Sequence, residues 1–372
     1  MPMAVNRLHT AELPAALRDD LTDSWDAFVA AASEAGLPVP SNPDFTASML
    51  RVWASSDFVS GICIDNPAVL YGLLESGDLL ADYSAGTYTR KLKRSLKGAS
   101  DAAELGRSLR EFREQEMLRI AWRDLAGWAP LNEVLGDLSA LADASVSVAL
   151  GYLGDWAVQR YTTGTKKKIK PEMVVLGMGK LGACELNFSS DIDLIFAYPE
   201  AGETDGERKA LSNEQFFIRL GQAVITALDQ VTAEGFVFRV DMRLRPYGES
   251  GALVHNFSAL EEYYQDQGRD WERYALIKAR PVTGDPACAQ ELMDSLRPFV
   301  FRRYVDFGVI ESLRGMKQMI TSEVRRRGLQ DNVKLGHGGI REVEFIAQCF
   351  QLIRGGRDLG LQQRELLPVL LE

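Results

Sequence analysis

Two aspartates, Asp191 and Asp193, stand two residues apart at the start of an apolar run that ends at Tyr198. Residues two apart on a β-strand point to the same face, so we expect their carboxylates to be neighbours. Two like charges held together raise each other's pKa unless a cation lies between them, and a hard divalent ion such as Mg2+ is the usual partner. The pair predicts a metal site. The alternative is a turn at the start of the strand that Asp191 caps.

A third acid lies in residues 236–245, FVFRVDMRLR, where apolar and polar residues alternate before Pro246. Alternation with a period of two predicts a strand with one buried face, which puts Asp241, Arg243 and Arg245 on the same side. Three carboxylates could hold two metal ions about 3.5 to 4 Å apart, and the arginines would neutralise phosphate charge. The alternative is that these three residues form a salt bridge among themselves.

A glycine-rich turn at residues 177–182, GMGKLG, follows a short apolar run and matches the dinucleotide-binding pattern GxGxxG. Only eight residues separate Gly182 from Asp191, too few for the crossover helix of a dinucleotide-binding fold. The turn is not a Walker loop either, because no Ser or Thr follows Lys180. What remains is a tight turn whose backbone amides and lysine could face a phosphate.

The spacing of apolar residues predicts the strands and helices that position these residues. Apolar runs at 173–176 and 192–198 predict buried strands, and a long helix is expected from Ser212, which is spaced with Gln215 as a capping box, to a stop at Gly235. Helical spacing dominates residues 1 to about 160 and 257 to the end, and TTGTKKKIKP at 162–171 predicts a solvated linker. We expect an α+β, mostly helical protein with a helical lobe at 1–165, a small-sheet core at 166–256 and a second helical lobe at 257–372.

Two charged stretches lie in the second helical lobe. Residues 268–280 carry charges at helical spacing, which most often form a solvated or salt-bridged face. Residues 338–345 begin a helix behind two glycines, where backbone amides could meet an anion, with Glu342 or Glu344 nearby.

Composition limits the partners and the compartment. The 372 residues carry a formal net charge of -10, which disfavours a nucleic-acid coat. The four cysteines form no CxxC pair, so we expect neither a zinc site nor a disulfide framework, and a reduced, cytoplasmic setting. The N-terminus lacks a signal-peptide pattern, and no run approaches the about 18 uninterrupted apolar residues of a membrane span. Neither nucleic acid nor a membrane is an expected partner.

Gly179, the Asp191-x-Asp193 pair and Asp241 on a later strand together resemble the nucleotidyltransferase superfamily of the polymerase-beta type. That superfamily usually has Gly-Gly or Gly-Ser at the turn, whereas here Lys180 occupies the second position. Longer strings, including GMGKLGACELNFSSDIDLIF, FRVDMRLRPYGESGALV and KLGHGGIREVEFIAQCFQLIRGG, are similar to the glutamine synthetase adenylyltransferase and adenylyl-removing enzyme family. This resemblance extends from about residue 47 to the end.

The resemblance implies a nucleotidyltransferase core at 166–256, two Mg2+ ions, ADP or ATP and phosphate as small ligands, and glutamine synthetase and a PII signalling protein as partners. The family carries two such domains in one polypeptide, and ELNFSSDIDLIF is the wording of its N-terminal, adenylyl-removing half. The implied reaction is phosphorolysis, in which phosphate attacks the AMP-tyrosine bond of adenylylated glutamine synthetase. We expect the residues to divide into metal-holding catalytic acids (Asp191, Asp193, Asp241), residues lining the nucleotide phosphates (Gly179, Lys180, Ser189, Ser190) and phosphate-binding arginines (Arg243, Arg245).

The residue types are suited to that chemistry independently of the family resemblance. Phosphate is already anionic and needs no deprotonation, so a chain with only three histidines, none of them in the motif strands, is not short of a base. The residues do not fix the direction, and an ATP-dependent adenylyltransferase acting on the same tyrosine is an alternative. A catalytically silent module that senses nucleotide or PII protein is another. The end of the sequence, LPVLLE, falls within a helical pattern, which suggests a truncated chain.

Overall fold

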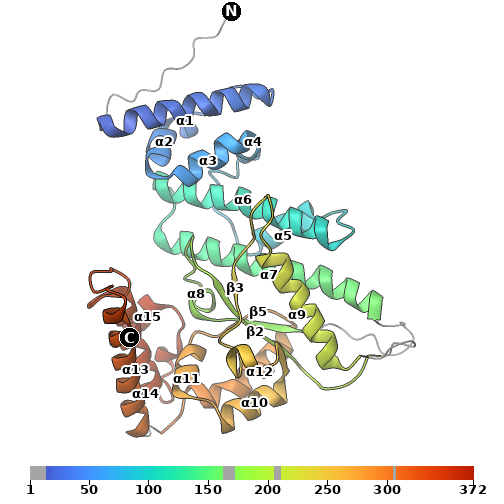
Figure 1. Cartoon of the computed structure of the whole chain (residues 1–372), viewed down its shortest axis with the longest axis vertical. Helices are drawn as coiled ribbons and strands as arrows, with labels where there is room; N and C mark the ends of the chain where they lie inside the picture. Colours follow the sequence, from blue (N-terminus) through green and yellow to red (C-terminus); the bar gives the residue numbers. More distant parts are fainter. Residues whose placement is uncertain (1–13, 162–171, 205–210, 305–306) are drawn as a thin grey trace, which may run out of the picture. The chain divides into compact units, whose positions relative to one another are not determined.

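The computed structural model describes residues 14–161, 172–204, 211–304 and 307–372. The expected linker at 162–171 and the expected lobe boundary at 165 lie outside the described residues. The chain divides into two compact units, one of residues 1–99 and 107–141 and the other of residues 100–106 and 142–372 (Figure 1). The second unit contains the small sheet together with the helices that follow it in the sequence.

The sheet of the second unit has five strands in the described residues: β1 (Val174–Gly177), β2 (Ile192–Tyr198), β3 (Val240–Asp241), β4 (Val254–Asn256) and β5 (Arg280–Thr283). Their order is β3-β2-β1-β5, with β4 also paired to β2. Strands β1 and β2 are antiparallel, whereas β3 and β4 run parallel to β2. The antiparallel β1–β2 pair confirms the exclusion of a dinucleotide-binding fold, in which these strands would be parallel.

The expected strand at 236–245 is wrong in extent, because only Val240 and Asp241 pair with β2. Strand β2 begins at Ile192, so residues before Val240 have no register partner on it, and residues 196–198 of β2 pair with β4 instead. The chain then turns, with the Arg245 amide donating to the Met242 carbonyl. Alternation of apolar and polar residues predicted burial on one side but could not show where the partner strand ends.

Strand β5 was not expected from the sequence and lies in the segment assigned there to the second helical lobe. Pro281 within it has no amide to donate, and β5 is the edge strand beside β1, where proline is tolerated. The sheet is therefore completed by a strand about a hundred residues beyond its partner β1.

Helices cover the sheet within the second unit. The short α8 (Gly179–Gly182) follows β1, and α9 (Asn213–Asp229) begins as expected, with the Ser212 hydroxyl accepting the Gln215 amide at 3.1 Å. Helix α9 ends before the expected stop at Gly235. The remaining helices are α10 (Phe257–Asp266), α11 (Asp270–Leu276), α12 (Pro286–Val300), α13 (Phe307–Arg326), α14 (Ile340–Arg354) and α15 (Leu366–Leu371).

The core of this unit joins one face of the sheet to these later helices. Ile195 and Ala197 of β2 contribute to a buried apolar cluster that also contains Leu260 of α10 and Leu292 of α12. Asp193 has the same alternation as Ile195 and Ala197 and stands near the start of the strand. The packing therefore fixes which side of the sheet Asp193 faces.

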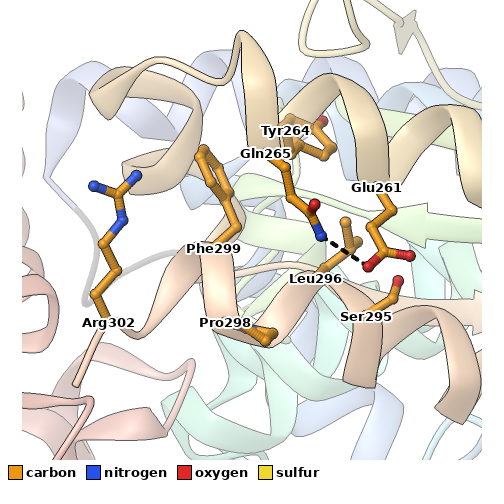
Figure 2. A pocket seen from close by; sticks show the side chains of 8 residues that line it. All are labelled: Glu261, Tyr264, Gln265, Ser295, Leu296, Pro298, Phe299 and Arg302. Carbon is orange, nitrogen blue, oxygen red and sulfur yellow. Dashed lines mark hydrogen bonds between the residues drawn. The ribbon is translucent and has the colours of Figure 1, made fainter.

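A cavity of about 280 Å³ lies between α10 and α12 (Figure 2). Its lining includes Glu261, Gln265, Phe299 and Arg302, and the Gln265 amide donates to the Glu261 carboxylate at 2.8 Å. None of the residues lining it is one of the site residues expected from the sequence.

The first unit is built from helices: α1 (Ala15–Glu34), α2 (Pro43–Ser55), α3 (Asp57–Asp65), α4 (Pro67–Glu75), α5 (Thr87–Ser95) and parts of α6 (Ala102–Ala126) and α7 (Leu131–Tyr161). Trp25, Phe28 and Trp53 pack their rings together in its core. By length and composition α7 could cross a membrane, but 67% of its apolar window is buried inside the protein, as in a core helix.

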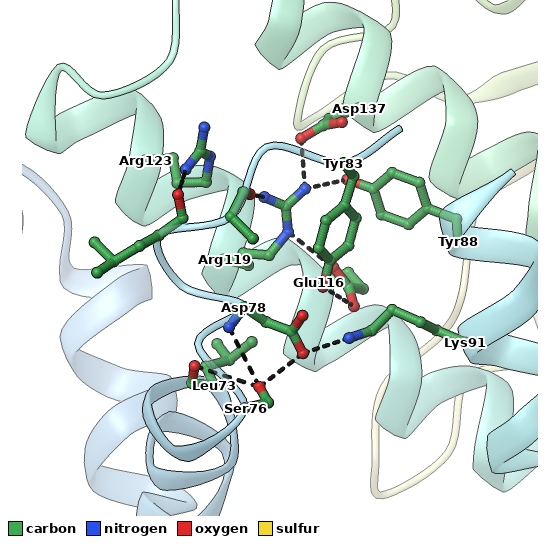
Figure 3. Close-up of polar contacts among 12 residues, drawn as sticks. Leu73, Ser76, Asp78, Tyr83, Tyr88, Lys91, Glu116, Arg119, Arg123 and Asp137 are labelled. Atoms are coloured by element: carbon green, nitrogen blue, oxygen red, sulfur yellow. Dashed lines mark hydrogen bonds and ion pairs between the residues drawn. The ribbon is translucent and has the colours of Figure 1, made fainter. Parts of the chain in front are cut away.

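A buried arginine, Arg119 of α6, organises the polar interior of this unit (Figure 3). Its guanidinium donates to Glu116 at 3.1 Å and to Asp137 at 2.6 Å, and it also donates to the Tyr88 hydroxyl and the Ala81 carbonyl. The guanidinium carbon lies 3.6 Å from the centre of the Tyr83 ring. The donors of a buried guanidinium cannot be left without acceptors, so this residue requires such a set of partners.

The Glu116 carboxyl is expected to make stability depend on pH. Burial raises its pKa to about 7, although Arg119 opposes the shift. Between roughly pH 4.5 and 7 the folded protein holds this proton while the unfolded chain releases it, so the contribution of Glu116 to stability falls as pH rises through that window. Denaturant titrations should show the unfolding free energy of the wild type decreasing relative to Glu116→Gln over this range. A constant difference between the two proteins from pH 4.5 to 8 would contradict the assignment.

Candidate active site

Asp193 and Asp241 are paired residues on neighbouring parallel strands. The β2–β3 register places Ile192 opposite Val240 and Asp193 opposite Asp241. Burial raises the pKa of the Asp193 carboxyl to about 6, and the charges of Asp241 and Asp191 add to that shift. The electrostatic effect of neighbouring acids is therefore seen at Asp193, whereas the pKa of Asp241 is lowered by Arg243.

Asp241 is held by Arg243. The arginine donates from Nη2 and Nε to Oδ2 at 2.5 and 2.8 Å, and its backbone amide donates to Oδ1 at 2.8 Å. These hydrogen bonds lower the pKa of the Asp241 carboxyl. The salt bridge that the sequence left as an alternative is thus present for this pair, and a turn, not a long strand face, brings the two side chains together.

Asp191 precedes β2 and pairs with Arg239 at 2.5 Å. The same guanidinium donates to the Ser189 carbonyl at 2.7 Å, so it ties the loop before β2 to the residue before β3. The sequence reasoning missed Arg239. Its spacing of two from Asp241 was the available signal, since Arg239, Asp241 and Arg243 share one alternation.

The Gly179 turn packs directly against Asp193. The Met178 amide donates to the Asp193 carbonyl at 2.9 Å, and Gly179 has a φ of 52°. A Cβ atom on Gly179 would lie 3.0 Å from Oδ2 of Asp193. Glycine is therefore needed here both for the left-handed backbone and for the close approach to the carboxylate.

Gly179→Ala is expected to lower activity as well as stability. An alanine in this conformation costs about 1–2 kcal/mol, and its methyl group would also displace the Asp193 carboxylate. Gly235→Ala is the matched control, because Gly235 has a φ of 83° but open space around it. Denaturation should show a similar loss for both variants, and assays should show an activity loss for Gly179→Ala alone. Equal activities would contradict a role for the close approach.

The hydrogen bonds of the remaining expected site residues are not made to the three aspartates. Ser190 donates to the Asn187 side chain at 2.6 Å, and Arg245 donates to the Met242 and Glu249 carbonyls, so its guanidinium braces the turn after β3. The Nε of Arg245 is buried and has no partner among the described residues. Burial lowers the pKa of Lys180, and the charges acting on it are those of Lys334, Glu344, Lys278 and Glu185. Their roles toward a nucleotide stay predictions.

The three aspartates are chemically suitable ligands for a divalent cation, but their carboxylates do not form a preformed coordination site. No three His, Cys, Asp or Glu side chains in the described ranges converge closely enough to hold a metal ion. Asp191 and Asp241 each have an arginine as counter-charge, whereas Asp193 has no hydrogen-bonded cation among the residues described. Carboxylate oxygens are ligands that Mg2+ prefers, and a bound cation would offset the charge of Asp193.

A small mixed sheet with acids on adjacent strands beside a glycine turn is an arrangement typical of nucleotidyltransferases. Residues 46–295 match the family described as "Glutamate-ammonia ligase adenylyltransferase", and residues 314–369 match "GlnD PII-uridylyltransferase". The chain belongs to the glutamate-ammonia ligase adenylyltransferase family, whose members are nucleotidyltransferases.

Relatives in several bacteria bear the name bifunctional glutamine synthetase adenylyltransferase/adenylyl-removing enzyme. The Pseudomonas aeruginosa protein is 58% identical over 322 residues, 86% of this chain and 33% of the relative. The Nitrosococcus oceani protein is 54% identical over 361 residues, 96% of this chain and 37% of the relative. The chain thus spans about a third of the length of the curated relatives it matches.

Proposed function

We propose that this chain removes AMP from adenylylated glutamine synthetase by phosphorolysis, releasing ADP and restoring the free tyrosine. The observation that carries the proposal is the pairing of Asp193 with Asp241 beside the Gly179 turn, in a chain similar to enzymes named for adenylyl removal. An oxygen of inorganic phosphate forms a bond to the AMP phosphorus, and the bond from that phosphorus to the tyrosine oxygen breaks. The phenolate that leaves then takes a proton from water.

The chain's own groups have defined tasks in this reaction. Asp191, Asp193 and Asp241 would hold Mg2+, which supplies Lewis-acid stabilisation of charge on the phosphate oxygens. Arg243, with its side chain 71% exposed, is available to share its charge between Asp241 and an incoming phosphate. The Gly179 backbone leaves room beside Asp193 that any side chain would fill. Positioning and charge neutralisation are sufficient because phosphate needs no base.

The partners and the setting form part of the same proposal. The match of residues 314–369 to a PII-uridylyltransferase family supports a PII protein as a regulatory partner. All four cysteines are free thiols, which is consistent with the cytoplasm, where glutamine synthetase and nucleotides would be supplied. An ATP-dependent adenylyltransferase is the second candidate, since the names of the relatives include that activity.

The test is an assay of ADP release. The protein is incubated with adenylylated glutamine synthetase, Mg2+ and inorganic phosphate, beside Asp191→Asn and the surface control Asp266→Asn. ADP that requires phosphate, disappears in Asp191→Asn and persists in Asp266→Asn supports phosphorolysis. AMP incorporation from ATP into unmodified synthetase, without ADP release in the first assay, would establish the transferase direction. Inactivity in both assays, with nucleotide binding retained, would favour the sensing module.

A further inference from the structure

Lys278 is a buried cation that lies beside the glycine-rich turn at residues 177–182. It lies between α11 and β5 with 5% of its surface exposed, and its ammonium group donates to Glu185 at 3.1 Å and to Glu344 at 2.6 Å. Glu185 follows the turn and Glu344 belongs to α14, so a single lysine connects segments from three parts of the sequence. Burying a lysine is costly unless it is fully paired, and this one has two carboxylates.

The backbone around Lys278 also touches the turn. Any side chain at Gly182 would overlap the Lys278 carbonyl oxygen. Two residues further on, the Arg280 guanidinium donates to the Leu181 carbonyl at 3.0 Å, and Asp143 pairs with that guanidinium. The segment 278–280 therefore supports α8 from the side of β5, through both backbone and side chains.

Glu185 is the centre of this support. Its Oε2 accepts from Lys278, and its Oε1 accepts the Leu366 amide at the start of α15 at 2.6 Å. The other end of the same turn is Gly179, which lies against the Asp193 carboxylate. A shift of Glu185 would therefore be transmitted over a few residues to the position of Gly179.

We infer that Lys278 is a positioning residue for the nucleotide site, acting through Glu185 to hold the Gly179–Glu185 turn against Asp193. The inference rests on the proposed function for its ligand, ADP with Mg2+. Glu344 also pairs with the lysine, and within the described part of the chain its carboxylate accepts from Lys278 and not from the turn. The two carboxylates that share Lys278 should therefore differ in their effect on the site.

The direct test is amide hydrogen exchange on the free protein. In Glu185→Gln and Lys278→Met, the amides of Gly182, Ala183 and Glu185, which bond within the turn, should exchange at least about tenfold faster than in the wild type. Amides of β2 should keep their protection. Glu344→Gln, which leaves the Lys278–Glu185 pair in place, should leave the turn unchanged. If the turn is equally protected in all variants, or loosens equally in Glu344→Gln, the inference is wrong.

A second measurement tests the consequence for the ligand. Titration with ADP and Mg2+ should give a dissociation constant raised about tenfold in Glu185→Gln and unchanged in Glu344→Gln, since groups that support a site from outside typically change affinity by about 10–100-fold. If Lys278→Met does not fold, the two glutamate variants decide the question. If the wild type binds no ADP while the turn loosens as expected, the proposed function fails, and what stands is that Lys278 holds the turn against Asp193.

Discussion

Asp193→Asn is expected to lower the proposed phosphorolytic activity by about 100-fold or more while leaving the fold intact. Loss of a carboxylate that would hold Mg2+ removes several kcal/mol of the charge stabilisation that the ion would give the transferring phosphoryl group, and each 1.36 kcal/mol is about tenfold in rate. The variant should still form β2, because the strand hydrogen bonds are made by the backbone. The measurement is initial-rate ADP release at saturating phosphate, with Asp266→Asn as the surface control.

The same variant should be more stable than the wild type in the absence of divalent ions. The pKa of Asp193 is raised to about 6, so above that pH the folded protein carries a partly buried carboxylate that the unfolded chain would solvate fully. The folded form holds this proton more tightly than the unfolded form, so the stability contribution of Asp193 is present at low pH and is lost as pH rises to about 6. In EDTA, Asp193→Asn should therefore gain stability relative to the wild type at pH 7.5 but not at pH 4. A variant that stays active, or one less stable at pH 7.5, would contradict this account of the site.

Arg119→Met is expected to cost about 3–5 kcal/mol of unfolding free energy, because it leaves Glu116 and Asp137 buried without their cation. Both the Arg119 and the Glu116 side chains are fully buried, so water cannot replace the lost hydrogen bonds. Chemical denaturation measures the loss. The matched control is Arg94→Met on the exposed surface of α5, where a change within about 0.5 kcal/mol is expected.

A double variant separates the buried charge from the lost packing. Glu116→Gln removes one of the two acids that Arg119 neutralises, so adding it to Arg119→Met should cost less than the sum of the two single changes. Strict additivity, or a loss from Arg119→Met no larger than that of Arg94→Met, would show that the cluster does not depend on its central cation.

The sequence by itself determined the local elements and the chemical types of the site. The apolar run of β2 has the bounds expected, Ser212 caps α9 as its spacing indicated, and the short interval from Gly182 to Asp191 excluded a dinucleotide-binding fold. These features depend on residues close together in the chain, which local pattern describes well. The family was recognisable for the same reason, since its motifs are contiguous strings.

Only the tertiary structure decided which distant groups meet around those acids. The sequence did not show that Arg239 pairs with Asp191, that β5 completes the sheet, or that Lys278 joins Glu185 to Glu344. Nor did it show that the strand carrying Asp241 is only two residues long, because strand length depends on where the partner strand begins and where the chain turns away from it. Such contacts are set by the path of the whole chain and by the close packing of its core, and neither leaves a periodic trace in the local sequence.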